Sequence, residues 1–315
     1  MADLVVEHLT VLLETGNGPA RVVDDVSFCV PAGRAVALVG ESGSGKTLTA
    51  LALLRLLPDV ARIVGGSVTL GDVDLVTLSE RALGKVRGAQ VAMVFQEPMT
   101  ALNPLVRVDD QAGEALRVHR GLSKKEARAA ATSTLERLGV PSARARAYPH
   151  ELSGGQRQRV MLAVALAASP AVLIADEPTT ALDVTVQAQI LALLQQERQA
   201  RGLGLLLITH DLGVVAEVCD DVVVMYAGRV VEAGGVVDVF ARPRHPYTRA
   251  LLASIPARAT PGEPLPQIPG QVPAPSSWPT GCRFRDRCAS ADETCASEPP
   301  VVVIDAQRVR CHHPC

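Results

Sequence analysis

Residues 40–47 read Gly-Glu-Ser-Gly-Ser-Gly-Lys-Thr, and the rest of the chain is organised around this stretch. It fits G-x-x-x-x-G-K-[ST], a motif that cradles phosphate groups. An apolar run at 34–39 suits a buried strand, and a Leu- and Ala-rich run at 48–57 suits a helix. A chance match in a Gly- and Ser-rich turn is the alternative. It is rejected because strand, loop and helix follow one another in the order that the motif requires.

Each residue type in this loop has a role in holding a triphosphate. The glycines permit a tight turn that points successive N–H groups at the phosphates, and the start of the helix adds its positive dipole end. Lys46 is expected to reach the β- and γ-phosphates, and the Thr47 hydroxyl to bind Mg²⁺. The predicted nucleotide-binding residues are Gly40, Glu41, Ser42, Gly43, Ser44, Gly45, Lys46 and Thr47.

Composition restricts the class of protein. At 315 residues the chain can hold one large core and a smaller appendage. Its 31 basic and 33 acidic residues give no overall field for nucleic acid, so no nucleic-acid partner is expected. The Met-Ala-Asp start lacks the basic and apolar regions of a secretion signal, and the apolar stretch 160–175 is too interrupted to span a bilayer. We therefore expect a cytosolic protein.

The remaining pattern predicts an α/β fold with a helical insertion. Helices are expected at 109–120 and 123–139, the second with a capping box formed by Ser123 and Glu126. They lie between two strand candidates and therefore read as an insertion into the α/β core. The strand candidates are 3–13, 26–30, 67–70, 91–95, 171–175, 203–208 and a hairpin over 221–225 and 229–232, with further helices at about 154–168 and 184–201.

An acidic pair ends the most apolar of these strands. Asp176 can bind Mg²⁺ directly or through water, and Glu177 points another way and can serve an attacking water. An acidic helix cap after a strand is the commoner explanation of such a pair taken alone. Together with the phosphate loop, the pair favours hydrolysis.

At this point several segments resemble the ATP-binding cassette (ABC) ATPases. Leu152-Ser153-Gly154-Gly155-Gln156 is similar to their signature, and Ala181-Leu182-Asp183 to their D-loop. Gln96 is similar to the Q-loop glutamine, Asp176-Glu177 to the Walker B pair and His210 to the switch histidine. Five motifs agree in order and spacing over roughly residues 3–250. The resemblance implies a P-loop ABC nucleotide-binding domain over residues 1–255, with a helical subdomain at about 98–170.

The resemblance also implies the role of each residue. Glu177 would polarise the attacking water, His210 would contact the γ-phosphate, and Gln96 would sense Mg²⁺ and water. Mg²⁺ would be held through Thr47, Gln96 and Asp176. Two cassettes would meet head-to-tail, with Ser153, Gly154, Gly155 and Gln156 of one closing on the ATP of the other and Asp183 lining the seam. ATP thus favours the closed pair, and hydrolysis releases it.

One position departs from the family pattern. Members usually stack adenine on an aromatic residue shortly before the phosphate loop, but Pro19-Ala20-Arg21-Val22 has none. Base stacking on an aromatic side chain is worth about 1–3 kcal/mol. Either Arg21 substitutes with its guanidinium plane, which we favour, or the affinity and base selectivity are lower.

Two segments point to one branch of the family. Residues 96–104, Gln-Glu-Pro-Met-Thr-Ala-Leu-Asn-Pro, and residues 243–248, Pro-Arg-His-Pro-Tyr-Thr, resemble ATPases of oligopeptide and dipeptide importers. Importers of nickel share most of these features and remain an alternative. In this branch a four-cysteine C-terminal region follows, here residues 256–315. Its first part, 256–279, contains eight prolines and predicts a surface linker or wrapping arm.

The cysteines of this region call for their own explanation. Five of the seven lie between Cys282 and Cys315, and the matching four are Cys282, Cys288, Cys295 and Cys311. Zinc sites usually show C-x2-C pairs, which are absent, and longer gaps suit a [4Fe–4S] cluster, a centre that the resemblance also implies. Zinc and unliganded thiols remain alternatives, and Cys315 and His312-His313 are spare ligands. Cys29 and Cys219 are expected to be small core residues.

The sequence therefore predicts the ATP-hydrolysing subunit of an importer, at the cytoplasmic face of the cell membrane. Its implied partners are a second, paralogous cassette, two transmembrane permease subunits and, indirectly, an extracytoplasmic solute-binding protein. A soluble ABC ATPase acting on nucleic acid or in iron–sulfur assembly is the alternative from another class. It is disfavoured because only about a hundred residues separate loop and signature, with no room for a long coiled coil, and because there is one cassette.

Overall fold

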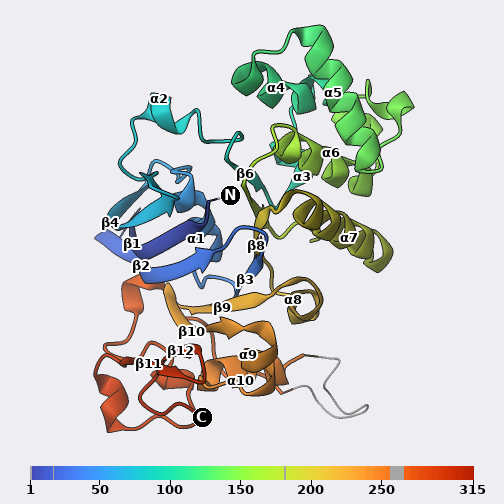
Figure 1. Ribbon diagram of the computed structural model, residues 1–315. Coiled ribbons are helices and arrows are strands. Elements are labelled where there is room, and N and C mark those ends of the chain that lie inside the picture. Colours follow the sequence, from blue (N-terminus) through green and yellow to red (C-terminus); the bar gives the residue numbers. More distant parts are fainter. Residues whose placement is uncertain (1, 17, 181, 256–265) are drawn as a thin grey trace. The chain divides into compact units, whose positions relative to one another are not determined.

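The computed structural model describes residues 2–16, 18–180, 182–255 and 266–315 (Figure 1). Two compact units make up the chain. The first unit comprises residues 1–4, 30–34 and 77–207, and the second comprises residues 5–29, 35–76 and 208–315. Part of the predicted linker 256–279 lies outside the described residues. Ala181 of the predicted D-loop also lies outside them.

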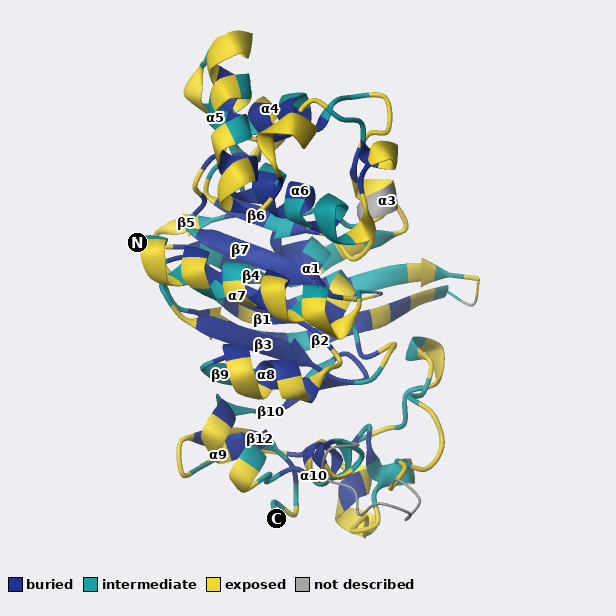
Figure 2. Cartoon of the chain, turned by 90° about the vertical axis from the view of Figure 1, so that its right-hand side faces the viewer, coloured by how far each residue is buried: buried dark blue, intermediate teal, exposed yellow. Residues whose placement is uncertain are grey.

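Buried strands form the centre of the first unit. β6 (Val91–Val94) pairs in parallel with β7 (Val172–Asp176), and β8 (Gly204–Ile208) is the next neighbour of β7. Every residue of β7 and β8 is buried, as Figure 2 shows for β7. Strands covered on both faces read as unbroken apolar runs, which is why these two were predicted within one residue at each end.

A helical block belongs to the same unit. α4 (Val108–Arg120) packs on α5 (Lys124–Arg137), and both pack on α6 (Gly154–Leu166). Leu116, Ala127 and Ala167 meet in a common apolar core. The predicted capping box is confirmed, since the Glu126 amide donates to Ser123 Oγ and the Ser123 amide donates to the Glu126 carboxylate. The remaining helices are α2 (Glu80–Leu83), α3 (Pro98–Ala101) and α7 (Val184–Arg201), with 3-10 turns at Ser142–Arg144 and Pro149–Glu151.

The second unit contains two sets of strands. In one, the order is β2-β1-β4-β5, with β1 at Leu4–Thr15, β2 at Gly18–Val30, β4 at Ala61–Leu70 and β5 at Val73–Asp74. In the other, the order is β11-β12-β10-β9-β3. Its strands are β3 (Ala35–Val39), β9 (Asp221–Tyr226), β10 (Arg229–Gly235), β11 (Val301–Ile304) and β12 (Gln307–Arg310). β3 runs parallel to β9, and β9, β10, β12 and β11 follow as antiparallel neighbours.

Helices and turns complete the second unit. They are α1 (Lys46–Leu53), α8 (Leu212–Val218), α9 (Val236–Ala241) and α10 (Pro246–Ala253), with 3-10 turns at Pro275–Ser277, Arg285–Arg287 and Glu293–Ala296. Among the helices of the described residues, none combines the length and hydropathy that a membrane span requires.

Two strands begin earlier than predicted. β2 begins at Gly18 rather than at residue 26, because Arg21 and Val22 extend the alternation of buried and exposed residues toward the N-terminus, and β4 begins at Ala61 rather than at residue 67. The sequence analysis did not predict β12, which pairs with β10 and so extends a sheet of the second unit. The strand β11 was missed although Val301-Val302-Val303-Ile304 has high strand propensity.

Candidate functional site

The phosphate-binding motif lies between β3 and α1, as its context predicted. Gly40 and Gly45 have φ angles of 150° and 100°, in the region that favours glycine. A Cβ at Gly40 would lie 2.2 Å from the Met225 carbonyl oxygen, and one at Gly45 would lie 2.8 Å from that of Val22. Any side chain at these two positions would therefore displace neighbouring backbone.

Lys46 closes the loop on itself. Its ammonium donates to the Gly40 carbonyl at 2.7 Å and to the Glu41 carbonyl at 3.0 Å. The Ser44 amide also donates to the Glu41 carbonyl, at 3.2 Å. Lys46 and Ser44 are buried, whereas Ser42, Gly43 and Thr47 are exposed. The loop thus combines a buried cation, Lys46, with residues that are exposed to solvent, an arrangement suited to an anionic ligand.

Arg21 lies on β2 of the same unit, and its guanidinium donates to Asp24 at 3.0 Å. The Arg21 side chain is 62% exposed, so its plane is accessible. The structure also places an aromatic residue of the C-terminal region near the phosphate-binding loop, which the sequence analysis did not predict. Trp278 lies against Gly228, whose amide donates to the Ser44 carbonyl at 2.9 Å. Trp278 is separated from the loop by 230 residues, so no local pattern could have indicated it.

The predicted acidic residues lie in the first unit. Asp176 ends β7 and is buried, and Glu177 follows it with a positive φ of 46°. Gln96 donates to the Glu177 carboxylate at 3.3 Å, and the Thr180 hydroxyl donates to the same oxygen at 2.6 Å. A non-glycine residue with positive φ is strained, and such strain concentrates at functional sites. The structure thus brings together Gln96 and Glu177 and adds Thr180, which the sequence reasoning missed.

The signature residues begin α6 in the same unit. Ser153 is the N-cap, and its hydroxyl accepts from the Gln156 amide at 3.3 Å while its proton stays available for donation. Ser153 and Gly154 are exposed. Gly155 faces α7, where an added Cβ would lie 2.8 Å from Val186 Cγ1. Close packing against α7 therefore accounts for a glycine at this position.

Two further predicted residues follow strands or turns. Asp183 is exposed and accepts from the Val186 amide at 2.9 Å, so it is the N-cap of α7. His210, in the second unit, is exposed and follows β8. Asp211 caps α8 by accepting from the amides of Gly213 and Val214.

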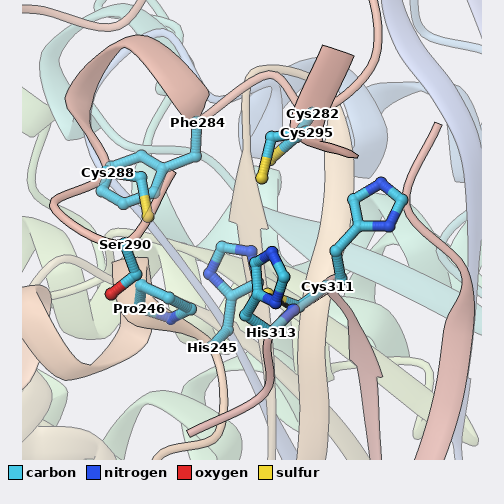
Figure 3. A pocket seen from close by; sticks show the side chains of 10 residues that line it. His245, Pro246, Cys282, Phe284, Cys288, Ser290, Cys295, Cys311 and His313 are labelled. Carbon is cyan, nitrogen blue, oxygen red and sulfur yellow. Dashed lines mark hydrogen bonds between the residues drawn. The ribbon is translucent and has the colours of Figure 1, made fainter. Parts of the chain in front are cut away.

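The four tail cysteines share one pocket. Cys282, Cys295 and Cys311 are buried and Cys288 is half-buried, and all four line a pocket with His245 (Figure 3). Its other lining residues are Pro246, Phe284, Ser290, His312 and His313. The structure thus brings together the four cysteines that the sequence analysis grouped, through β12 and the 3-10 turns of the second unit.

The environment of these thiols opposes uncompensated negative charge. Burial, together with the charges of Cys282, Cys288 and Cys315, raises the pKa of Cys311 to about 11. Burial and the charges of Cys295 and Cys288 likewise raise the pKa of Cys282. A cation in the pocket would reverse this preference, because thiolates bind metals and repel one another.

His245 borders the same pocket as a neutral ring. Complete burial lowers its pKa to about 3, and its Nδ1 accepts from the Tyr247 amide at 3.0 Å. A second donor set overlaps the cysteines: ligand atoms of Asp292, Cys295 and His313 lie within 4.8 Å of one another. Of the two cysteines predicted to be core residues, Cys219 is buried but Cys29 is exposed, so that prediction is wrong for Cys29.

Comparisons with known proteins agree with this arrangement. Residues 23–180 match the ABC transporter family, and residues 231–295 match the oligopeptide/dipeptide transporter C-terminal region. A Brucella abortus protein is 51% identical, over 96% of this chain and 94% of its own length. A Brucella suis protein is 48% identical, over 98% of this chain and 94% of its own length. Both are named as peptide import ATP-binding proteins, an assignment that the names themselves mark as provisional.

Solved structures give the same result. The dimeric, post-hydrolysis structure of the ATP-binding cassette MJ0796 with ADP and phosphate superposes with a TM-score of 0.67 and 28% identity, over 74% of this chain and 98% of that one. CbiO1 of Clostridium perfringens, part of an ABC transporter complex, superposes with a TM-score of 0.64 and 29% sequence identity, over 76% of this chain and 90% of that one. The fold, the motifs and these relatives establish that the chain belongs to the ABC transporter family, as an ATP-binding cassette protein.

Proposed function

We propose that this protein is the ATP-hydrolysing subunit of an ABC importer that takes up dipeptides or oligopeptides across the cytoplasmic membrane. The observation that carries the proposal is the match of residues 231–295 to the oligopeptide/dipeptide transporter C-terminal region. The names of relatives that align over nearly the whole chain support the same substrate class. Domain boundaries at 1–255 for the cassette, with its helical subdomain at about 98–170, and 256–315 for the C-terminal region are part of this proposal.

The proposed mechanism assigns each residue a task. The loop from Gly40 to Thr47 holds the ATP phosphates, and Arg21 covers the base. Thr47, Gln96 and Asp176 would hold Mg²⁺, which would neutralise charge on the phosphates. Glu177, oriented by Gln96 and Thr180, polarises the attacking water, and His210 contacts the γ-phosphate.

A second cassette completes each ATP site in this proposal. The exposed N-terminus of α6, with Ser153, Gly154, Gly155 and Gln156, meets the partner's γ-phosphate, because a helix N-terminus binds anions. Asp183 lies at the seam between the cassettes. The proposed assembly comprises a paralogous second cassette, two transmembrane permease subunits and, indirectly, an extracytoplasmic solute-binding protein, with no nucleic acid. The cassette is thereby placed peripherally at the cytoplasmic face of the membrane.

Transport by the complete assembly tests the function. The chain is co-expressed with candidate permease subunits and a second cassette from the same organism, and the complex is reconstituted in proteoliposomes with a solute-binding protein. We expect ATP-dependent uptake of labelled di- to pentapeptides. Uptake of Ni²⁺ instead would favour the nickel-importer alternative. ATP hydrolysis by a chain that never associates with permeases would favour a soluble ATPase.

We further propose that the four tail cysteines hold a [4Fe–4S] cluster, with zinc as the alternative. The residues fit such a group: four thiols line one pocket, three of them are buried, and four cysteine thiolates are the usual ligands of this cluster. Zinc would suit the overlapping donor set of Asp292, Cys295 and His313. A bound metal would stabilise a region with a small apolar core.

Metal analysis distinguishes these alternatives. Anaerobically purified protein is expected to contain iron and acid-labile sulfide in equal amounts, about four of each per chain. Cys288→Ser should lose both, whereas Cys29→Ser, an exposed cysteine outside the pocket, should retain both. If the protein instead contains one tightly held zinc and no iron, the site holds zinc and not a cluster. Four freely titratable thiols without any metal would refute both.

A further inference from the structure

An arginine of the C-terminal region contacts the phosphate-binding loop. Arg287 Nη1 lies 2.8 Å from Glu41 Oε2, and Arg287 Nη2 lies 2.9 Å from Glu41 Oε1. The two parallel hydrogen bonds form a bidentate pair, the strongest geometry for these groups. The Arg287 side chain is only 6% exposed, so water screens this pair less than an ion pair on the surface.

Arg287 is itself held in one orientation. Its Nε donates to the Pro269 carbonyl at 2.7 Å, and its guanidinium lies 5.7 Å from the centroid of the Tyr226 ring. Tyr226 and Phe284 pack edge-on at 5.2 Å between ring centroids. A guanidinium fixed by backbone and aromatic contacts loses little further freedom when it binds a carboxylate. Arg287 is therefore preorganised to hold Glu41.

A second contact reaches the same loop residue. The Glu41 amide donates to the Tyr247 hydroxyl at 2.8 Å. Tyr247 is fully buried and packs on Tyr226 at 4.7 Å between ring centroids. The side chain and the amide of Glu41 are thus both held by residues that lie far beyond the loop in the chain.

The backbone of Glu41 in turn contacts the cation of the loop, the Lys46 ammonium. Its carbonyl accepts from the Lys46 ammonium at 3.0 Å and from the Ser44 amide at 3.2 Å. A change in the position of Glu41 would therefore move the groups that are proposed to meet the phosphates. Through Glu41, Arg287 is therefore coupled to both Lys46 and Ser44.

We propose that Arg287 is a positioning residue for ATP binding, through which the C-terminal region holds the phosphate-binding loop in its binding conformation. This inference rests on the proposed binding of ATP by residues 40–47. It predicts that the C-terminal region contributes to nucleotide affinity as well as to folding. The contribution is lost when either member of the Arg287–Glu41 pair is replaced.

Equilibrium binding of Mg·ATP to the full chain tests the proposal. Arg287→Ala is expected to raise the Kd about tenfold, the effect typical of a lost charge-assisted hydrogen bond. Glu41→Gln, which leaves Arg287 and Cys288 in place, should raise the Kd to a similar extent. The double variant should bind no more weakly than either single variant, because both remove one interaction. Arg287→Lys, which retains the charge but not the fork, should recover part of the affinity.

A neighbouring arginine provides the matched control. Arg285 donates to the Thr280 carbonyl at 2.8 Å and pairs with Asp286, and neither partner belongs to the loop. Arg285→Ala should leave the Kd unchanged. If Glu41→Gln and Arg287→Ala both bind with wild-type Kd while their Tm values fall, Arg287 only anchors the C-terminal region and the inference is wrong. If the wild-type chain itself does not bind Mg·ATP, the proposed function fails instead.

Discussion

Replacing Glu177 with glutamine is expected to leave the Kd for Mg·ATP close to the wild-type value and to reduce ATP turnover by about 10²–10⁴-fold, the usual contribution of a general base. The amide retains the size of the carboxylate and can still accept from Thr180, which donates at 2.6 Å in the native protein. It cannot take a proton from water. Turnover is measured by phosphate release at saturating ATP, and binding by calorimetry.

Glu126 provides a control for this substitution. It is an exposed glutamate in the capping box of α5, and glutamine also fits the third helical position of such a box. Glu126→Gln should therefore leave turnover and binding unchanged. If Glu177→Gln hydrolyses ATP at the wild-type rate, Glu177 does not act as the general base. Loss of ATP binding in that variant would instead make Glu177 a ligand-binding residue.

The parts of this molecule that sequence analysis predicted correctly are governed by local chemistry. The loop glycines follow from backbone geometry, and the capping box at Ser123 and Glu126 involves residues three apart. The buried strand β7 carries its own apolar signature over four consecutive residues, 172–175. In each case the residues that determine the structure are neighbours in the chain, so a short window contains the necessary information.

The contacts that the sequence did not reveal join distant segments. Gln96 meets Glu177 across 81 residues, and Arg287 meets Glu41 across 246. Residues of these types occur throughout the chain, and only the fold determines which of them meet. The positive φ of Glu177 has the same origin, because surrounding contacts impose it against the local preference of a non-glycine residue.

Another group of ion pairs surrounds the buried carboxylate of Asp24 on β2. This carboxylate is 3% exposed and pairs with three arginines. Arg229 Nη2 lies 2.8 Å from its Oδ2, Arg21 donates to its Oδ1, and Arg283 of the C-terminal region also donates to it. The guanidinium of Arg283 stacks on Trp278 with 3.6 Å from Cζ to the ring centroid. Burial and the charge of Arg229 lower the pKa of Arg283 to about 10, and Asp24 opposes that shift.

Asp24→Asn is therefore expected to lower the free energy of unfolding by about 3–5 kcal/mol, because it leaves the buried guanidinium of Arg283 without its carboxylate and leaves Arg229 with Glu298 as its carboxylate partner. Chemical denaturation at neutral pH measures the change. The adjacent Asp25 is the control: it pairs with Arg310 at 2.7 Å but is 40% exposed, so Asp25→Asn should cost only about 0–1 kcal/mol. Equal losses in the two variants would contradict a special role for the buried carboxylate.

The pH dependence of the Asp24 contribution gives an independent test with a defined sign. Burial alone would raise the pKa of Asp24, but Arg283, Arg229 and Arg21 outweigh it and hold the pKa below its usual range. The contribution to stability is therefore fully present above the pKa of the unfolded chain, about 3.9, and is lost as the pH falls through the lower folded value. The stability difference between the wild type and Asp24→Asn should stay constant from about pH 7 to pH 5 and shrink below about pH 4. A difference that instead grew on acidification would mean that Asp24 is protonated in the folded protein, and the buried charge of Arg283 would then need another partner.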